Sequence, residues 1–332
     1  MGDFSQTRQN VQLQSLTSDL AADAEQNKNE IIFKSEIEPR VAELIRLSIT
    51  DSTRIGYRSD LDHFMRWGGV IPATAEMVAA YLAEFSETLA VATNQRRVAA
   101  ISVVHDAGGY PNPCKSILVR STMNGIKRLR GVAQKQAKPL LKEDLVAILD
   151  VMGDGVKDAR DRALLLLGFA GAFRRSELIG LDHADIEHVR QGVILHLRKS
   201  KTDQLGHGRK IGVPPARGRH CPVAAIDAWL ERSGIVEGAV FRNVNRHGQI
   251  ASTRLSGEGV ALVVRERLKA AGLDPAGFSG HSLRAGFCTS AAQVGVSSLK
   301  IKAQTGHSSD AMLSRYIRDG QLFLDNACAA LL

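Results

Sequence analysis

The pattern of apolar positions is irregular at first and becomes helical after residue 38. Residues 1–37 are rich in Gln, Asn, Ser, Asp and Glu with scattered hydrophobic residues, a composition typical of a flexible leader. From Pro39 onward, apolar residues recur at helical spacing through 41–49 and again from Ile55 to Met65. We expect Asp51 or Ser52 to cap this second helix. Further helices are predicted over 75–85, 93–107 and 115–130, so residues 38–133 form an all-α bundle.

A polar stretch separates this bundle from a second domain. Residues 131–138 contain Gln and Lys without an apolar pattern, and Pro139 follows, as in a linker. The alternation in 193–198 predicts a strand that returns as a hairpin through 210–213. Helices are predicted after Lys142 and over 160–172, 223–233, 257–271, 282–294, 298–305 and 311–317. The sequence therefore predicts a mainly α protein with a small β-sheet, in two domains over 38–133 and 134–332.

Charge narrows the class of partner. A chain of 332 residues with 44% hydrophobic residues is long enough for two cores. The formal net charge is +8, but residues 1–38 hold three basic and seven acidic residues, which leaves 40 basic and 28 acidic residues, a net +12, for the remainder. Such a surplus favours a polyanion through phosphate contacts, although an RNA or a membrane surface would suit the charge equally well.

Cysteine usage and hydropathy predict the compartment. The four cysteines, Cys114, Cys221, Cys288 and Cys328, form no CxxC pair and have no histidine at zinc-ligand spacing, so we interpret them as reduced thiols. The sequence shows no secretory leader and no apolar run near 18 residues. We therefore expect a cytoplasmic protein, associated with the nucleoid, that does not bind membranes.

Six residues in the second domain carry the candidate chemistry. They are Arg174, Lys201, His281, Arg284, His307 and Tyr316. Guanidiniums can neutralise the charge that accumulates on phosphate oxygens during attack on a phosphodiester, and His281 and Arg284 lie three residues apart on one helix face. Together these groups can break and remake a phosphodiester bond without metal or nucleotide, so we expect no cofactor.

The nucleophile and the proton carriers follow from side-chain acidity. Tyr316 has an ordinary pKa of about 10, so only about one molecule in a thousand is ionised at neutral pH and a base is needed. His281 is our candidate base, and His307 is expected to hydrogen-bond the phosphate. Lys201 is the candidate acid for the leaving 5′ oxygen, with Lys199 as the alternative because several basic residues crowd the same hairpin.

The strings that contain these residues resemble one family. GAFRRSEL around Arg174, KSKTD around Lys201, HSLR, GHS and the final YIR occur in an order and spacing similar to the tyrosine recombinases, or phage integrase family. The resemblance spans about 39–332 and is nearest to the Cre-like branch. In the family's motif the residue after the arginine is often apolar, whereas Arg175 stands here. We assign the phosphate to Arg174, because it keeps the spacing to Glu177, a supporting partner, while Arg175 is expected to face DNA.

The resemblance implies a mechanism and an assembly. A helical core-binding domain and a catalytic domain would close as a C-shaped clamp on duplex DNA with inverted repeats. Tyr316 would form a 3′-phosphotyrosyl link, and strands would be exchanged through a Holliday junction without ATP. The helix 321–332 would dock into a neighbouring protomer, so that monomers in solution form a homotetramer on two synapsed sites, with accessory proteins as further partners.

Two other functions remain open, and base recognition is less defined. A type IB topoisomerase uses similar chemistry as a monomer, and a catalytically silent DNA-binding protein would keep only the basic helices. Predicted DNA contacts are Arg54, Arg58, Arg96, Arg97, Lys127, Arg128, Arg130, Arg175, Lys199 and Glu258, the last of which could accept from a cytosine amino group.

Overall fold

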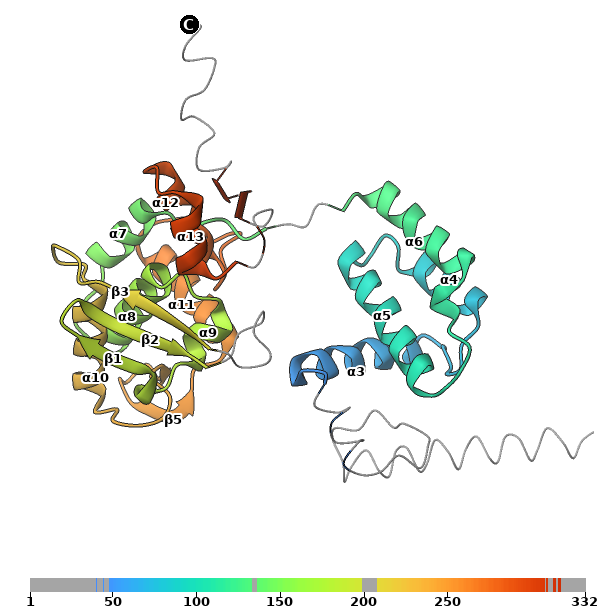
Figure 1. Cartoon of the computed structure of the whole chain (residues 1–332), viewed down its shortest axis with the longest axis horizontal. Coiled ribbons are helices and arrows are strands. Elements are labelled where there is room, and N and C mark those ends of the chain that lie inside the picture. Colours follow the sequence, from blue (N-terminus) through green and yellow to red (C-terminus); the bar gives the residue numbers. More distant parts are fainter. Residues whose placement is uncertain are drawn as a thin grey trace, which may run out of the picture. The chain divides into compact units, whose positions relative to one another are not determined.

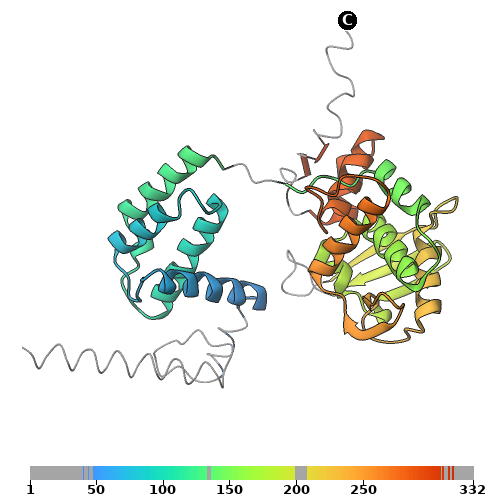
Figure 2. The same cartoon turned by 180° about the vertical axis from the view of Figure 1, so that it is seen from behind.

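The chain divides into two compact units, residues 1–134 and 135–332 (Figures 1 and 2). The computed structural model describes residues 40, 44, 48–132, 136–198, 208–307, 309, 313, 314, 316 and 317. The predicted leader, Lys199, Lys201, Cys328 and the predicted exchange helix lie outside the described residues. Among the described residues, no helix has the length and hydropathy that crossing a membrane requires.

The first unit is built from helices. Its described elements are α3 (Asp51–Arg66), α4 (Ala75–Glu84), α5 (Val91–Ala107), the short 3₁₀ helix η1 (Pro113–Lys115) and α6 (Ile117–Arg130). Phe64, Tyr81 and Ile101 are fully buried in its core, which joins α3, α4 and α5. Thr50 caps α3, since its Oγ1 accepts from the amide of Thr53, and this corrects our assignment of the cap to Asp51 or Ser52.

The second unit combines helices with two small sheets. Its helices are α7 (Lys142–Asp150), α8 (Val156–Ala170), α9 (Arg175–Gly180), α10 (Pro222–Ser233), α11 (Gly257–Ala270), α12 (Ser282–Gln293) and α13 (Ser298–Thr305), with the 3₁₀ helix η2 (His183–Asp185). Residues 313, 314, 316 and 317 are also helical. The mainly α fold with a small β component is thus confirmed, and α9 was not predicted.

The larger sheet is antiparallel, in the order β1 (Ile186–Val189), β2 (Gly192–Leu197), β3 (Arg209–Val213). Leu195 pairs with Ile211 and Leu197 with Arg209, so the loop between β2 and β3 leaves from this last pair. Alternate residues of β2 are buried, as the sequence pattern predicted. The second sheet is the hairpin of β4 (Arg242–Val244) and β5 (Ile250–Arg254), which we did not predict because it is short and mostly polar.

A large apolar core positions most of the site in the second unit. α8 runs through this core with Leu164, Leu165 and Leu167 buried, and Trp229 of α10 is fully buried beside it. The segment before α7 crosses α12 so closely that a Cβ on Gly286 would lie 1.6 Å from the carbonyl oxygen of Leu140. α8 contacts both α9 and α12, and α12 contacts α13 (Figure 1). Arg174, His281, Arg284 and His307 lie in or next to the ends of these helices.

Candidate active site

Arg174 stands at the turn between α8 and α9. After α8 the chain passes through Ala172, a buried non-glycine residue with a φ of 49°, and Arg174 then becomes the N-cap of α9. The Glu177 carboxylate accepts from the Arg174 amide at 2.8 Å and from its Nη1 at 2.6 Å. The Glu177 side chain is 1% exposed, so these two hydrogen bonds hold the Arg174 guanidinium in one orientation.

Arg284 is a buried cation on α12. Its Nη1 donates to the carbonyl oxygens of Ala172 and Thr305, both at 2.7 Å, which ties together the ends of α8 and α13. Its Nη2 is buried and has no hydrogen-bond partner among the described residues. Burial, reinforced by the nearby charge of Arg174, lowers the pKa of Arg284 to about 10, so the group is still charged at neutral pH.

His307 follows the end of α13 and is also buried. Its Nδ1 lies 2.8 Å from the hydroxyl oxygen of Thr305, which fixes the orientation of the ring. Burial and then the charges of Arg284 and Arg174 lower the pKa of His307 to about 4. The imidazole is therefore neutral at pH 7 and can hydrogen-bond an anion without competing for charge with the arginines.

Tyr316 and His281 meet at the edge of this cationic group. The Tyr316 hydroxyl lies 3.2 Å from Nε2 of His281, which is the N-cap residue of α12 and is exposed. The ring centroids of Tyr316 and His307 are 6.2 Å apart. The Tyr316 ring packs partly against the small apolar cluster of Cys288 and its neighbours, so its hydroxyl is held at the surface of the second unit.

The structure brings together five of the six predicted catalytic residues. Lys201 and its alternative Lys199 lie outside the described residues, on the loop that leaves from the pair of Leu197 and Arg209. Arg175 is exposed, and its side chain lies across Gly257 and Gly280, where an added Cβ would approach within 2.9 Å. Glu258 is exposed as well and accepts from Arg265 at 2.7 Å.

Arg209 is a residue of this region that we did not predict. The Nη1 of Arg209 donates to the carbonyl oxygen of Gln304 at 2.9 Å, and its Nη2 lies 3.7 Å from Oε2 of Glu177. A sequence signal existed: Arg209 shares the β3 face of the buried residues Ile211 and Val213, whereas the neighbouring Lys210 is exposed on the other face. The period of two thus separates Arg209 from the other basic residues of the hairpin.

The predicted DNA contacts of the first unit differ in their surroundings. Arg97 has a side chain that is 9% exposed, donates to the hydroxyl of Tyr81 at 2.9 Å and lies 3.6 Å from the buried carboxylate of Asp60. Arg97 therefore belongs to the interior, and we do not keep it as a DNA contact. Arg96 is half exposed but makes a bidentate pair with the same Asp60, at 2.6 and 2.9 Å.

Four other predicted DNA contacts of this unit lie on α3 and α6. Arg58 and Arg128 are exposed, on α3 and α6 respectively. Arg54 pairs with Asp51, and Arg130 donates to the carbonyl oxygens of Ser86 and Glu87. These four arginines stay predicted DNA contacts.

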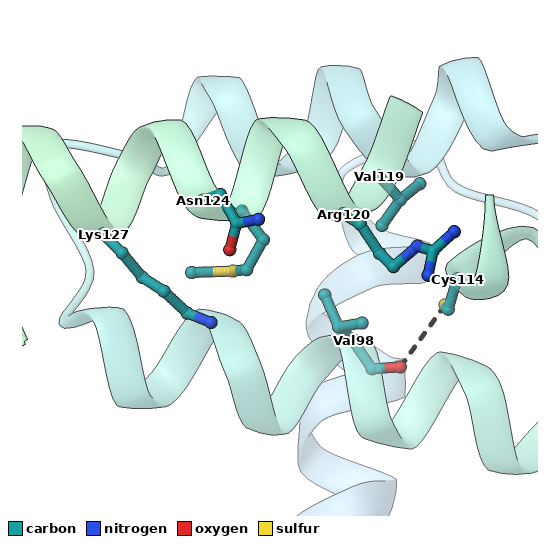
Figure 3. A pocket seen from close by; sticks show the side chains of 7 residues that line it. Val98, Cys114, Val119, Arg120, Asn124 and Lys127 are labelled. Carbon is teal, nitrogen blue, oxygen red and sulfur yellow. Dashed lines mark hydrogen bonds between the residues drawn. The ribbon is translucent and has the colours of Figure 1, made fainter. Parts of the chain in front are cut away.

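A cavity of about 240 Å³ lies between α5 and α6 (Figure 3). Arg120, Asn124 and Lys127 of α6 line it on one side, and Val98 of α5 on the other. Cys114 donates from its thiol to the Val98 carbonyl, and burial raises the pKa of this thiol to about 11. The thiol is therefore protonated and unreactive at neutral pH, and the cavity is not part of the candidate active site, which lies entirely in the second unit.

Comparisons with known proteins agree with this geometry. The model of the phage integrase family matches residues 138–321. The integrase/recombinase xerD homolog of Selenomonas ruminantium is 41% identical over 290 residues, which cover 84% of this chain and 85% of the relative. The chain therefore belongs to the phage integrase family. It is a tyrosine recombinase, an enzyme that cleaves and rejoins DNA, as the sequence predicted.

Solved structures support the fold. The integrase of the Tn1549 transposon, in complex with transposon right end DNA, has a TM-score of 0.56 at 17% identity and covers 81% of this chain and 89% of its own. The XerH site-specific recombinase bound to a palindromic difH substrate has a TM-score of 0.54 at 20% identity, with coverages of 78% and 71%. The nearer likeness to the Cre-like branch stays a prediction.

Proposed function

We propose that this site-specific recombinase cleaves DNA with Tyr316 as the nucleophile. The Tyr316 oxygen attacks the scissile phosphorus, a 3′-phosphotyrosyl bond forms, and the bond to the 5′ oxygen breaks with protonation of that oxygen. A 5′ hydroxyl from a partner duplex then attacks the phosphotyrosine and releases Tyr316. The observation that carries this proposal is the approach of the Tyr316 hydroxyl to His281, 3.2 Å away, beside a buried Arg284 whose Nη2 has no partner among the described residues.

Arg174 and Arg284 stabilise the charge on the two non-bridging phosphate oxygens. Both guanidiniums are held by fixed acceptors, Glu177 for Arg174 and two backbone carbonyls for Arg284, so they are oriented before DNA binds. Preorganised donors of this kind cost no reorganisation during the reaction, and loss of one typically lowers the rate by about 10²- to 10³-fold.

His281 and His307 have different roles in this scheme. His281 is exposed and within hydrogen-bond distance of the phenol, so it accepts the Tyr316 proton. His307 is neutral, and its Nδ1 is already engaged with Thr305, so its other nitrogen is directed to the phosphate. This division leaves the base in contact with solvent, where it can release the proton.

Lys201 supplies the proton to the leaving 5′ oxygen, with Lys199 as the alternative. Replacing that oxygen by sulfur removes the need for an acid, because a thiolate is a much better leaving group than an alkoxide. A duplex with a 5′-bridging sulfur at the cleavage position should therefore restore cleavage to the variant that lacks the acid. We expect rescue of Lys201→Ala, with Lys199→Ala as its matched control.

DNA recognition and assembly extend this proposal. The protein binds duplex DNA with inverted repeats through basic residues such as Arg58 and Arg128, and the two units close around the duplex as a clamp. Protomers form a tetramer on two synapsed sites, with residues 321–332 docked into a neighbour. A relative of the same fold, lambda integrase, has been solved as a tetramer bound to a Holliday junction, which supports the fold's capacity for this assembly. We also propose that the protein is located in the cytoplasm with the chromosome, and its bacterial recombinase relatives support the cytoplasmic part of this proposal.

A suicide duplex tests the proposal. The substrate carries inverted repeats recovered beside the gene and a nick near the cleavage position, so that the cleaved fragment diffuses away and the covalent complex accumulates. We expect a covalent protein–DNA band in EDTA without ATP, and its loss in Tyr316→Phe. A retarded complex without a covalent band on any candidate site would favour a silent DNA-binding protein. A band that religates only its own strand, without exchange between duplexes, would favour a type IB topoisomerase.

A further inference from the structure

Arg209 connects three parts of the candidate active site. It is the first residue of β3, and its side chain is 24% exposed. The guanidinium donates to the Gln304 carbonyl at the end of α13, and it lies 3.7 Å from the Glu177 carboxylate at the start of α9. A cation at the C-terminal end of a helix is favoured by the helix dipole and by the unpaired carbonyls there, so this contact stabilises the last turn of α13.

The turn before His307 is shaped to accept this guanidinium. Gly306 ends α13 with a φ of 63°, and a Cβ at this position would lie 2.6 Å from Nη1 of Arg209. Only glycine allows both the left-handed backbone and the close approach of the arginine. The turn at Gly306 therefore packs against Arg209, and this contact lies directly before His307 in the chain.

The charges around Glu177 also connect Arg209 to the candidate active site. Glu177 is a buried carboxylate that is shared by Arg174, at 2.6 Å, and Arg209, at 3.7 Å. Burial is the largest influence on Arg209 and lowers its pKa, while the Glu177 charge opposes this effect. Arg209 also adds to the positive charge that keeps His307 neutral. One carboxylate thus fixes two guanidiniums, of which one faces the phosphate in the proposed mechanism.

We propose that Arg209 is a positioning residue for strand cleavage, which holds the Gly306–His307 turn and the Glu177 carboxylate in register with each other. It acts through His307 and Arg174, and it does not touch the reacting atoms. The proposal rests on the proposed function, because positioning is defined by the cleavage step. The alternative is direct binding of DNA by Nη2, which is buried without a hydrogen-bond partner among the described residues.

The first test compares Arg209→Met and Arg209→Lys with Lys210→Met. Lys210 is the matched control, because it is the adjacent cation on the exposed face of β3. Under single turnover on the suicide duplex at saturating protein, we expect Arg209→Met to lower the rate of covalent complex formation by about 100-fold, the usual effect of a displacement near 1 Å in a site. Arg209→Lys should recover part of the rate, and Lys210→Met should stay within about twofold of the parent.

Direct DNA binding and positioning give different results in this test. Positioning predicts that the affinity of Arg209→Met for intact DNA changes little while the saturated rate falls. A normal saturated rate with weakened binding would overturn the proposal in favour of DNA binding by Nη2. In a Trp67→Phe background, the Trp229 fluorescence of each variant shows whether the second unit is folded, since Trp229 is fully buried in its core.

A double-mutant cycle with Gly306 tests the contact itself. Gly306→Ala places a methyl group against Arg209, so part of its effect on the rate should disappear in an Arg209→Ala background. We expect the double variant to be clearly faster than the product of the two single effects predicts. Effects that simply multiply would mean that the two residues act independently, and the proposal would be wrong.

A measurement without DNA separates this proposal from the proposed function. In an NMR titration, Arg209→Met should raise the pKa of His307, because a nearby positive charge is removed, whereas Lys210→Met should leave it unchanged. An unchanged His307 pKa in Arg209→Met would contradict the proposal even if the protein never cleaved DNA. Absence of cleavage by the parent protein would instead contradict the proposed function and leave this titration as the deciding result.

Discussion

Replacement of Glu177 by glutamine tests the electrostatic framework of the site. Glu177 is 1% exposed and accepts from the Arg174 amide at 2.8 Å and from the Arg174 guanidinium at 2.6 Å, with Arg209 at 3.7 Å. Glutamine keeps the shape and one carbonyl acceptor but removes the negative charge. The guanidiniums of Arg174 and Arg209 then lie in a poorly hydrated site without their counterion. The nearby charge of Arg284 adds to the repulsion between them.

The expected cost is large for a single isosteric change. Removal of one partner from a buried ion pair typically costs about 3–5 kcal/mol, and we expect about 3 kcal/mol here because the remaining amide can still cap α9. For a domain of this size class that corresponds to a fall in Tm of about 6–12 °C. Sulfate should recover part of the loss, because an anion that binds the folded arginines stabilises the folded state.

The assay uses the placement of the two tryptophans. Trp67 lies in the first unit and Trp229 in the second, so Trp67→Phe leaves a single reporter of the second unit. Urea unfolding of this background with and without Glu177→Gln gives the difference in the free energy of unfolding. The control is Glu266→Gln, whose exposed pair with Lys157 should contribute less than about 1 kcal/mol. A loss for Glu177→Gln no larger than that of the control would refute the reasoning.

Three further predictions concern pH, DNA binding and packing. The folded pKa of His307, about 4, lies below its ordinary value of 6.5, so its contribution to stability is present above pH 6.5 and is lost as the pH falls towards 4, by about 3 kcal/mol in total. The free energy of unfolding of the parent should therefore fall more steeply across this range than that of His307→Gln, and equal slopes would contradict the prediction. Arg97→Met should destabilise the first unit by about 3 kcal/mol, because Arg97 belongs to a buried hydrogen-bond network. Arg128→Met should leave the stability unchanged and should lower the slope of log affinity for DNA against log salt concentration by about 1. Equal effects of the two variants on stability would contradict this prediction. Gly286→Ala should lower the free energy of unfolding by about 3 kcal/mol, at the upper end of the usual cost of overpacking, because the added methyl group would contact the Leu140 backbone. A thermal unfolding curve that matches the parent would show that the backbone can move apart at this crossing.

Most of the correct predictions from the sequence came from strongly periodic segments and from the spacing of the motifs. The long amphipathic helices and the alternation of β2 predicted their elements, and the motifs predicted which residues would meet. The short α9 and the β4–β5 hairpin were missed, because a six-residue helix and a polar hairpin have no periodic apolar signal. The cap of α3 was assigned one or two residues too late, since Thr50, Asp51 and Ser52 all suit a helix start.

Contacts between distant segments that no motif marks could not be predicted from the sequence. Arg97 and Arg128 are both basic residues on helices, but only the fold buries one beside Asp60 and exposes the other. Arg209 likewise gains its surroundings from Gln304, which is 95 positions away in the chain. The local sequence pattern determines on which face of a helix or strand a residue lies. Tertiary packing determines which other residues that face contacts.

The most direct test of the central claim is to identify the residue that becomes linked to DNA. The chain has four tyrosines, Tyr57, Tyr81, Tyr110 and Tyr316, so nuclease and protease digestion of the covalent complex followed by mass spectrometry can separate them. We predict a nucleotide attached through the 3′ phosphate to Tyr316 in every modified peptide. Attachment to another residue, or through a 5′ phosphate, would contradict the account of Tyr316 as the nucleophile beside His281.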